Sequence, residues 1–217
     1  MADKNLMQVA GKPLLAHSLA QARSSGLFAA IAVSSDSPRI LSTAEIWGAD
    51  LLVERPDELA TDSAPKLPAI QHAFEWAERV TGERFDTLVD LDATSPLRST
   101  EDIRGAVALL ESSGVSQVIT GTPARRSPYF NMVEVAEDGS VRLVKENTPP
   151  VARRQDAPAC FDMNASIYVW SRDGLFGRSH PFNPDVRLFV MPEERSIDID
   201  SPLDARIVRI LMEGDGH

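Results

Sequence analysis

The sequence predicts an α/β fold of the Rossmann-like type, in which helices cover both faces of a mostly parallel sheet. Short apolar runs alternate with amphipathic stretches of helical spacing, and the connections between them are short. This strand–helix alternation is typical of parallel sheets that are buried on both faces. A chain of 217 residues has the length of one main domain. We therefore expect a single domain over residues 1–217.

The helices are predicted from apolar stripes and from residues that begin or end a helix. Pro13 suits a first helical turn, and Gly26 and Gly48 each follow a helical stretch. The expected helices cover residues 13–25, 38–47, 66–80, 100–111 and 202–212. The expected strands cover residues 29–33, 50–53, 88–92, 117–120, 165–170 and 187–190.

Residues 124–160 interrupt the alternation. They contain several prolines and paired arginines, and Asp138-Gly139 lies between two short strand-like segments, 131–135 and 141–144. Asp-Gly between such segments is a hairpin signal. We expect a small hairpin excursion from the main sheet.

Composition excludes several classes of function. The formal net charge of −10 argues against a nucleic-acid surface, which needs a basic stripe. Cys160 is the single cysteine, so no intrachain disulfide forms, and we expect a reducing, cytoplasmic location. No apolar stretch approaches the length of a membrane span, and the amino terminus does not resemble a signal peptide. We expect neither a nucleic-acid partner nor a membrane.

The segment 88–98, LVDLDATSPLR, is the first candidate for a ligand site. A strand ends there in a loop of small polar residues with Arg98, and Ser99 opens a helix directly afterwards. Open α/β sheets bind ligands where strands end and helices begin.

The segment 194–200 is the second candidate. If it forms a strand, Asp198 and Asp200 point to the same face while Ile197 and Ile199 anchor the other. Two carboxylates on one face could hold a hard cation such as magnesium. Alternatively, this is a half-exposed strand that runs into a helix N-terminus, capped by Asp200 or Ser201. The spacing alone leaves both interpretations open.

Other polar groups carry weaker signals. Arg55 lies in a loop with Asp62 and Ser63, and this loop is either functional or simply long. The excursion carries four arginines, which either bind anions or form solvated charges at an interface: Arg125, Arg126, Arg153 and Arg154. The histidines lack zinc-ligand spacing, and no phosphate-loop motif is present.

Taken together, short motifs in order along the chain resemble those of the acylneuraminate cytidylyltransferase family. This family comprises the CMP-sugar synthetases that activate sialic acid and related 2-keto-3-deoxy sugars. The similar segments are Lys4-Asn5 with GKPL at 11–14, SSD at 34–36, RPDELATD at 55–62, TSPLR at 94–98, NASIY at 164–168 and SIDID at 196–200.

The resemblance implies a nucleotide-diphospho-sugar transferase type of fold, and a homodimer formed through the excursion at residues 124–160. It implies attack of a sugar acid's anomeric hydroxyl on the α-phosphate of CTP, with magnesium or manganese as cofactor and release of pyrophosphate. Asp198 and Asp200 would be the catalytic metal ligands. The nucleotide would contact Lys4, Asn5, Arg55, Asp62 and Ser63. The keto-deoxy sugar acid would contact Asp92, Thr94, Ser95, Arg98, Arg154, Gln155 and Asn164.

Two features depart from the family. Asp92 stands where many members carry glutamine. The family's first strand and phosphate-binding loop would precede Asp3, so we expect about 15–20 further residues upstream in the natural protein. Because a first strand usually lies mid-sheet, strands 29–33 and 88–92 would each have an unpaired edge without it.

Two other functions remain open. One is a cytidylyltransferase for the shorter 3-deoxy-manno-octulosonate, and pyrophosphate release with a panel of sugars would discriminate it. The other is a catalytically silent subunit that binds sugar but not CTP, which would show no turnover.

Overall fold

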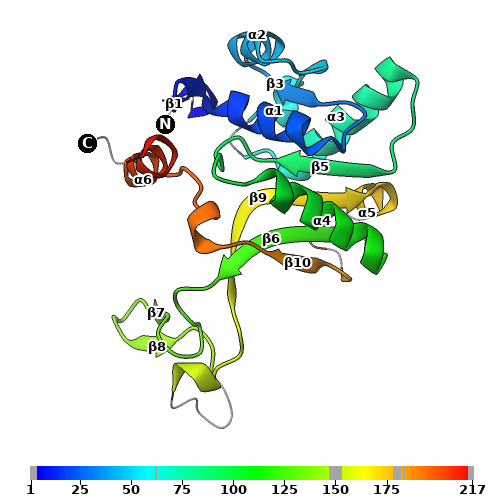
Figure 1. Cartoon of the computed structure of the whole chain (residues 1–217). Coiled ribbons are helices and arrows are strands. Elements are labelled where there is room, and N and C mark those ends of the chain that lie inside the picture. Colours follow the sequence, from blue (N-terminus) through cyan, green and yellow to red (C-terminus); the bar gives the residue numbers. More distant parts are fainter. Residues whose placement is uncertain (1–3, 62, 147–152, 178–181, 183, 215–217) are drawn as a thin grey trace.

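The computed structural model describes residues 4–61, 63–146, 153–177, 182 and 184–214 and has the α/β fold that the sequence predicts (Figure 1). Four strands form a sheet in the order β10-β6-β9-β5, and β3 and β4 form a separate parallel pair. The strands are β3 (Ala32–Ser35), β4 (Leu51–Glu54), β5 (Thr87–Leu91), β6 (Gln117–Pro123), β9 (Phe161–Ser171) and β10 (Arg187–Val190). The sheet is less uniformly parallel than expected, because β9 runs antiparallel to both β5 and β6.

The five predicted helices are confirmed, with ends that shift by one or two residues. They are α1 (Leu14–Ser25), α2 (Pro38–Ile46), α3 (Lys66–Thr81), α4 (Thr100–Ser113) and α6 (Pro202–Glu213). The short helix α5 (Arg172–Phe176) was not predicted. Gly26 and Gly114 end their helices with φ of 69° and 65°, a conformation that glycine adopts without strain. Within the described residues, no helix is both long and apolar enough to span a bilayer.

The largest core cluster lies between α4 and the sheet. Ile103 and Val107 of α4 pack with Val118 of β6 and with Ile167 and Val169 of β9, all nearly inaccessible to solvent. Each such side chain contributes about 1.5–3 kcal/mol through burial. This packing holds β5, β6 and β9 firmly beneath the loops that follow them.

The pair β3–β4 does not join the four-stranded sheet. Both β3 and β5 therefore have an edge with no strand partner in the described part of the chain, as the sequence led us to expect. The side chains of β5 are all only partly buried, whereas six consecutive residues of β6 are buried. The side of β5 that faces β3 is thus open.

The predicted hairpin is confirmed within residues 124–160. The strands β7 (Val133–Val135) and β8 (Val141–Leu143) pair antiparallel, and Gly139 in their turn has φ of 80°. Figure 1 shows this arm projecting away from the sheet, with the 3₁₀ turn η3 (Arg154–Asp156) toward its far end.

Several strand predictions need correction. Strand β3 begins three residues later than expected, at Ala32, whereas β9 begins four residues earlier, at Phe161, and β6 ends three residues later, at Pro123. The predicted strand over 194–200 is wrong, because Glu193–Arg195 form the 3₁₀ turn η4 and the residues that follow are not in a strand. Ile197 and Ile199 nevertheless pack inward, against the cluster formed around Leu14 and Val208. The alternation therefore reflects an extended segment with one buried face, without a neighbouring strand.

Candidate active site

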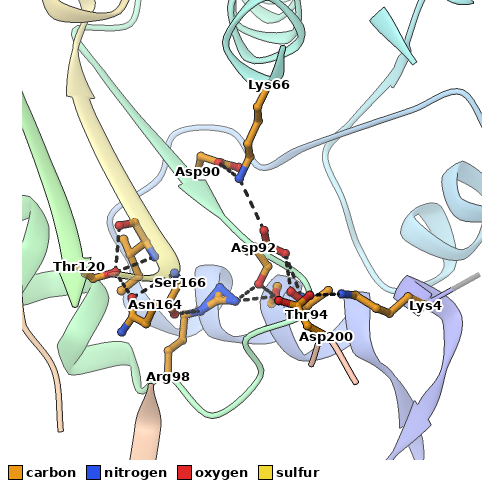
Figure 2. A network of polar contacts seen from close by, with 12 residues as sticks. Lys4, Lys66, Asp90, Asp92, Thr94, Arg98, Thr120, Asn164, Ser166 and Asp200 are labelled. Atoms are coloured by element: carbon orange, nitrogen blue, oxygen red, sulfur yellow. Dashed lines mark hydrogen bonds and ion pairs between the residues drawn. The ribbon is translucent and has the colours of Figure 1, made fainter. Parts of the chain in front are cut away.

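The two candidate segments meet at the carboxyl end of β5. The backbone N–H of Ile199 donates to the carbonyl of Thr94 at 2.9 Å, which joins the segment 196–200 to the TSPLR loop. Figure 2 shows Asp92, Thr94, Asp200 and Lys4 close to one another as a result. Residues about one hundred positions apart thus form a single polar cluster.

Asp92 is held in a fixed orientation. Its Oδ1 accepts hydrogen bonds from the N–H and the hydroxyl of Thr94, at 3.1 and 2.9 Å. The ammonium of Lys66 lies 3.5 Å from its Oδ2 and 2.8 Å from Asp90. Burial alone would raise the pKa of Asp92, but the charge of Lys66 and the bonds from Thr94 outweigh it and lower that pKa. Asp92 is therefore an ionised acceptor at neutral pH.

Arg98 supports this loop from beneath. Its side chain is fully buried and donates to the carbonyl of Asp92 and to the hydroxyls of Ser18 and Ser166 (Figure 2). Burial lowers its pKa to about 10, so it remains charged at neutral pH. Ser95 is also buried, and its hydroxyl lacks a hydrogen-bond partner among the described residues. Both side chains point inward.

The carboxylates of Asp198 and Asp200 lie close enough to interact. Partial burial and the neighbouring Asp200 raise the pKa of Asp198, while hydrogen bonds from Lys4 and from Asp198 lower the pKa of Asp200. Lys4 Nζ lies 2.8 Å from Asp200 Oδ1. The helix cap is Ser201, whose hydroxyl accepts from the N–H of Asp204, so Asp200 is free of that role.

An ion pair anchors the segment that carries these carboxylates. Arg195 donates to both carboxylate oxygens of Asp102, at 2.8 and 3.0 Å. Asp102 also caps α4 together with Ser99. Burial opposes ionisation of Asp102, but Arg195 and Ser99 outweigh it and lower its pKa.

Asn164 occupies a supporting position. Its side chain is buried, accepts from the hydroxyl of Thr120 at 2.7 Å and donates to Ser196 at 3.0 Å. It thus ties β6 and β9 to the start of the segment 196–200. A direct contact with a sugar stays a prediction.

Two of the predicted nucleotide residues line a cavity of about 750 Å³. Arg55 and Asn5 both line it, and the guanidinium of Arg55 donates to the carbonyl of Ser34 at 2.8 Å. Ser63 is exposed and lies 3.5 Å from the hydroxyl of Thr61. Asp62 lies outside the described residues.

The remaining sugar-site predictions fall on the arm. Gln155 is exposed in η3, and only the backbone of Arg154 is described there. Figure 1 shows the arm that carries η3 well away from β5 and α6, next to which Asp92 and Asp200 lie along the chain. Within one chain, the described structure does not bring these residues to the site.

Lys66, Asp90 and Tyr168 belong to the cluster but were not among the predicted site residues. Lys66 begins α3 and reaches down onto Asp90 and Asp92, as Figure 2 shows. Its ammonium lies 5.2 Å from the ring centroid of Tyr168, which stacks on Trp170. From the sequence alone, a lysine at the start of an amphipathic helix is expected to be solvent-exposed. Its contacts become visible only in the structure, where this end of α3 lies over β5.

Comparison with known proteins gives consistent relatives. The cytidylyltransferase family matches residues 1–196. The chain is 41% identical over 210 residues to CMP-N,N'-diacetyllegionaminic acid synthase of Campylobacter jejuni, and 40% identical over 211 residues to the post-translational flagellin modification protein B of Campylobacter coli. Each match covers 97% of this chain and 88% of the relative.

A solved structure also resembles this one. CMP:2-keto-3-deoxy-manno-octonic acid synthetase, complexed with CTP, superposes with a TM-score of 0.67 at 16% identity, and the match covers 98% of this chain and 92% of that one. At this identity the likeness concerns the fold. Family match, relatives and fold agree, and the chain belongs to the acylneuraminate cytidylyltransferase family of CMP-sugar synthetases.

Proposed function

We propose that this enzyme couples CTP to a nonulosonic acid of the diacetyllegionaminic type and releases pyrophosphate. The observation that carries the proposal is the hydrogen bond from Ile199 to Thr94, which unites the paired carboxylates and the TSPLR loop in one site. The name of the 41% identical Campylobacter jejuni relative favours this sugar over the eight-carbon alternative.

Asp198 and Asp200 fit a divalent cation. Their carboxylates lie close enough for the pKa of Asp198 to be raised by burial and by Asp200, and a cation would relieve the repulsion between them. Among the described residues, no group of three or more His, Cys, Asp or Glu side chains is arranged to hold a metal ion. Magnesium suits such a site, because it takes one or two carboxylates and fills its other positions with phosphate oxygens and water.

The chain's own groups would position the reactants. When bound, the metal would neutralise charge on the triphosphate as the α-phosphate is attacked. Lys4 lies beside Asp200 and can exchange that carboxylate for a phosphate oxygen. Asp92, fixed by Thr94 and Lys66, offers an ionised acceptor to a sugar hydroxyl or amide N–H. Phosphoryl transfer depends mostly on such positioning and charge neutralisation.

In a homodimer, the arm at residues 124–160 would contact the second copy of the chain. Several apolar side chains of the arm are exposed, among them Val133, Val135 and Val141 at 53%, 68% and 62%. Burying them against a second copy would remove apolar surface from water. It could also bring Gln155 to the sugar site of the partner, which η3 does not reach within one chain.

Pyrophosphate release from CTP tests the proposal. The panel of acceptors is N,N'-diacetyllegionaminic acid, pseudaminic acid, N-acetylneuraminic acid and 3-deoxy-manno-octulosonate. We expect the highest kcat/KM with the first. Preference for the octulosonate would support the alternative substrate, and sugar binding without turnover would support a silent subunit.

The metal role has its own test. Asp200→Asn should lower kcat by about 100-fold or more at fixed magnesium while leaving the unfolding transition nearly unchanged, because Asp200 is exposed. Asp173→Asn, at an exposed carboxylate on α5, is the matched control and should keep full activity. Wild-type turnover by Asp200→Asn at low magnesium would contradict the assignment.

A further inference from the structure

A lysine and two carboxylates meet at the carboxyl end of β5. Asp90 lies in this strand and Asp92 directly follows it, with its N–H still bonded to the carbonyl of Ser166 on β9. The two aspartates are two residues apart in extended backbone, so their side chains point to the same face of the sheet. Lys66 reaches this face from the start of α3, and its ammonium lies 2.8 Å from Asp90 and 3.5 Å from Asp92 (Figure 2). All three side chains line the cavity.

These residues occupy positions that their own secondary structure disfavours. Aspartate is depleted in strands, and a lysine at the start of a helix meets the positive end of the helix dipole. Nothing at the start of α3 offsets this locally, because its first turn has no acidic residue and Pro65 provides no side-chain cap. Local conflicts of this kind are expected at functional or strained sites.

The sheet beneath Lys66 gives its ammonium a defined position. Asp90 is the register partner of Tyr168 on β9, so both side chains stand on the same face. The ammonium lies 5.2 Å from the centroid of the Tyr168 ring, and that ring stacks on Trp170 with 5.5 Å between the centroids. A carboxylate and the face of an aromatic ring therefore hold the cation together.

Both Lys66 and Asp92 keep hydrogen-bonding capacity for a ligand. The ammonium has three N–H donors, of which Asp90 takes one. Asp92 Oδ1 accepts from the N–H and the hydroxyl of Thr94, whereas Asp92 Oδ2 faces Lys66 at 3.5 Å, which is longer than an ordinary hydrogen bond. The exposed fractions of the Lys66 and Asp92 side chains are 53% and 30%. A donor and an acceptor thus lie next to each other within reach of a ligand.

The charge of this cluster disfavours the anionic parts of the substrates. Toward the cavity it presents two carboxylates and one ammonium. Arg98, which donates to the Asp92 carbonyl, is 2% exposed and is not among the residues that line the cavity. A phosphate or the carboxylate of a sugar acid would meet a net negative surface here, and like charges repel. An uncharged part of the ligand fits this surface better.

A hydroxyl group matches a donor and an acceptor that are neighbours. Its oxygen accepts one hydrogen bond while its hydrogen takes part in another. Two bonds of about 2.8 Å at a roughly tetrahedral oxygen place their partners about 4.5 Å apart. Lys66 Nζ would therefore move about 1 Å away from Asp92, which its flexible four-carbon stem allows. A secondary amide does not match, because its N–H and its C=O point in opposite directions.

We propose that Lys66 and Asp92 together bind one hydroxyl group of the sugar acid, to which Lys66 donates and from which Asp92 Oδ2 accepts. Asp90 is then a positioning residue, because it sets where the Lys66 ammonium stands. The identity of the ligand as a sugar acid rests on the proposed function. Lys66 and Asp90, which lie outside the motifs shared with the family, thereby take part in substrate selection.

A cycle that combines enzyme variants with deoxy analogues tests this inference. The substrates are the sugar acid with the highest kcat/KM and analogues that each lack one hydroxyl but keep the reacting anomeric one. With the wild type, one analogue should lose about tenfold or more in kcat/KM. With Lys66→Met, the parent sugar should already show most of that loss, and removal of the same hydroxyl should cost less than about threefold further. The other analogues should lose the same factor with both enzymes.

Three further variants separate this contact from a general loss of activity. Lys66→Arg keeps a cationic donor and should retain more discrimination than Lys66→Met. Asp90→Asn should raise KM for the sugar with little change in kcat, as expected of a positioning residue. Lys12→Met is the matched control and should behave as the wild type, because the Lys12 ammonium also lies near an aromatic ring, 5.9 Å from the centroid of Trp47, but outside the cavity.

Binding measurements make the test independent of turnover. If no sugar acid in the panel yields a CMP-sugar, the proposed function fails, whereas the same cycle measured as Kd of the sugar by calorimetry still tests the hydroxyl contact. Independent, multiplicative losses for Lys66→Met and every deoxy analogue would overturn the inference, and so would a wild type that binds no sugar acid. Coupling of Lys66→Met to N-methylation of an acetamido group would instead assign the pair to an amide. Coupling to a ribose hydroxyl removed from CTP would assign it to the nucleotide, and either result would overturn the assignment to a sugar hydroxyl.

Discussion

The ion pair between Arg195 and Asp102 allows a quantitative prediction. Arg195→Met removes the bidentate partner of Asp102 while keeping most of the side-chain length. Asp102 is 4% exposed and Arg195 is 35% exposed, so the pair is partly screened by solvent. Oδ1 loses its Arg195 partner at 3.0 Å, whereas Oδ2 keeps the Ser99 N–H and hydroxyl, both at 2.8 Å.

These contacts set the expected magnitude. Breaking a fully buried pair costs about 3–5 kcal/mol, and a hydrogen bond to a charged group contributes about 1.5–3 kcal/mol. With the Ser99 bonds retained, we expect the free energy of unfolding to fall by about 2–3 kcal/mol near pH 7. Arg142→Met is the matched control, because Arg142 and Glu134 are 75% and 48% exposed, and it should cost less than about 0.5 kcal/mol.

The effect should depend on pH in one direction. The pKa of Asp102 is lowered in the folded state. The stabilisation is therefore complete at pH values above the pKa that Asp102 has in the unfolded chain, and it is lost as the pH falls through the pKa that Asp102 has in the folded protein. The difference between wild type and Arg195→Met should thus shrink below about pH 4. Urea unfolding at about pH 7 and about pH 3.5 measures it. A difference below about 0.5 kcal/mol at neutral pH, or one that stays constant down to pH 3.5, would refute the reasoning.

Three further outcomes are expected. Lys66→Met removes the ammonium that lies 2.8 Å from Asp90. In steady-state kinetics it should raise KM for the sugar by about tenfold, with a smaller change in kcat. An unchanged KM would exclude Lys66 from sugar positioning. Ala165 has φ of 50°, so Ala165→Gly should stabilise the fold by about 0.5–1 kcal/mol in thermal unfolding, and a lower Tm would contradict this. CTP should bind at least about tenfold more weakly with EDTA than with magnesium in calorimetry, and equal affinities would argue against the Asp198–Asp200 metal site.

The helices and much of the sheet could be predicted from the sequence because helical spacing, capping residues and strand alternation are local signals. Helical spacing with Gly26 at an end, or Ser99 at a start, reports interactions within a few residues. Alternation at Ile197 and Ile199 reports only which side chains are buried, so it does not distinguish a paired strand from an extended segment that packs on helices.

The site is only partly visible in the sequence for the same reason. The motifs identify Asp92, Asp198 and Asp200, but their meeting depends on a backbone bond between segments that are remote along the chain. The burial of Arg98 and the reach of Lys66 depend on where β5 lies relative to α1 and α3. No spacing rule encodes these positions, since they follow from the packing of the whole sheet.

The charges at the site resolve an apparent conflict between an acidic chain and a triphosphate substrate. Among the described residues, three cations in or beside the cavity already have protein acceptors 2.8 Å away: Lys4 with Asp200, Arg55 with the Ser34 carbonyl, and Lys66 with Asp90. Binding a triphosphate would therefore exchange partners for Lys4 and Arg55. Pairs at this level of exposure are individually worth at most about 1 kcal/mol, so the exchange costs little. It would, however, leave Asp200 without Lys4 and next to Asp198, with more negative charge arriving. A divalent cation is the group that compensates both carboxylates and phosphates at once, which links nucleotide binding to metal binding in this site.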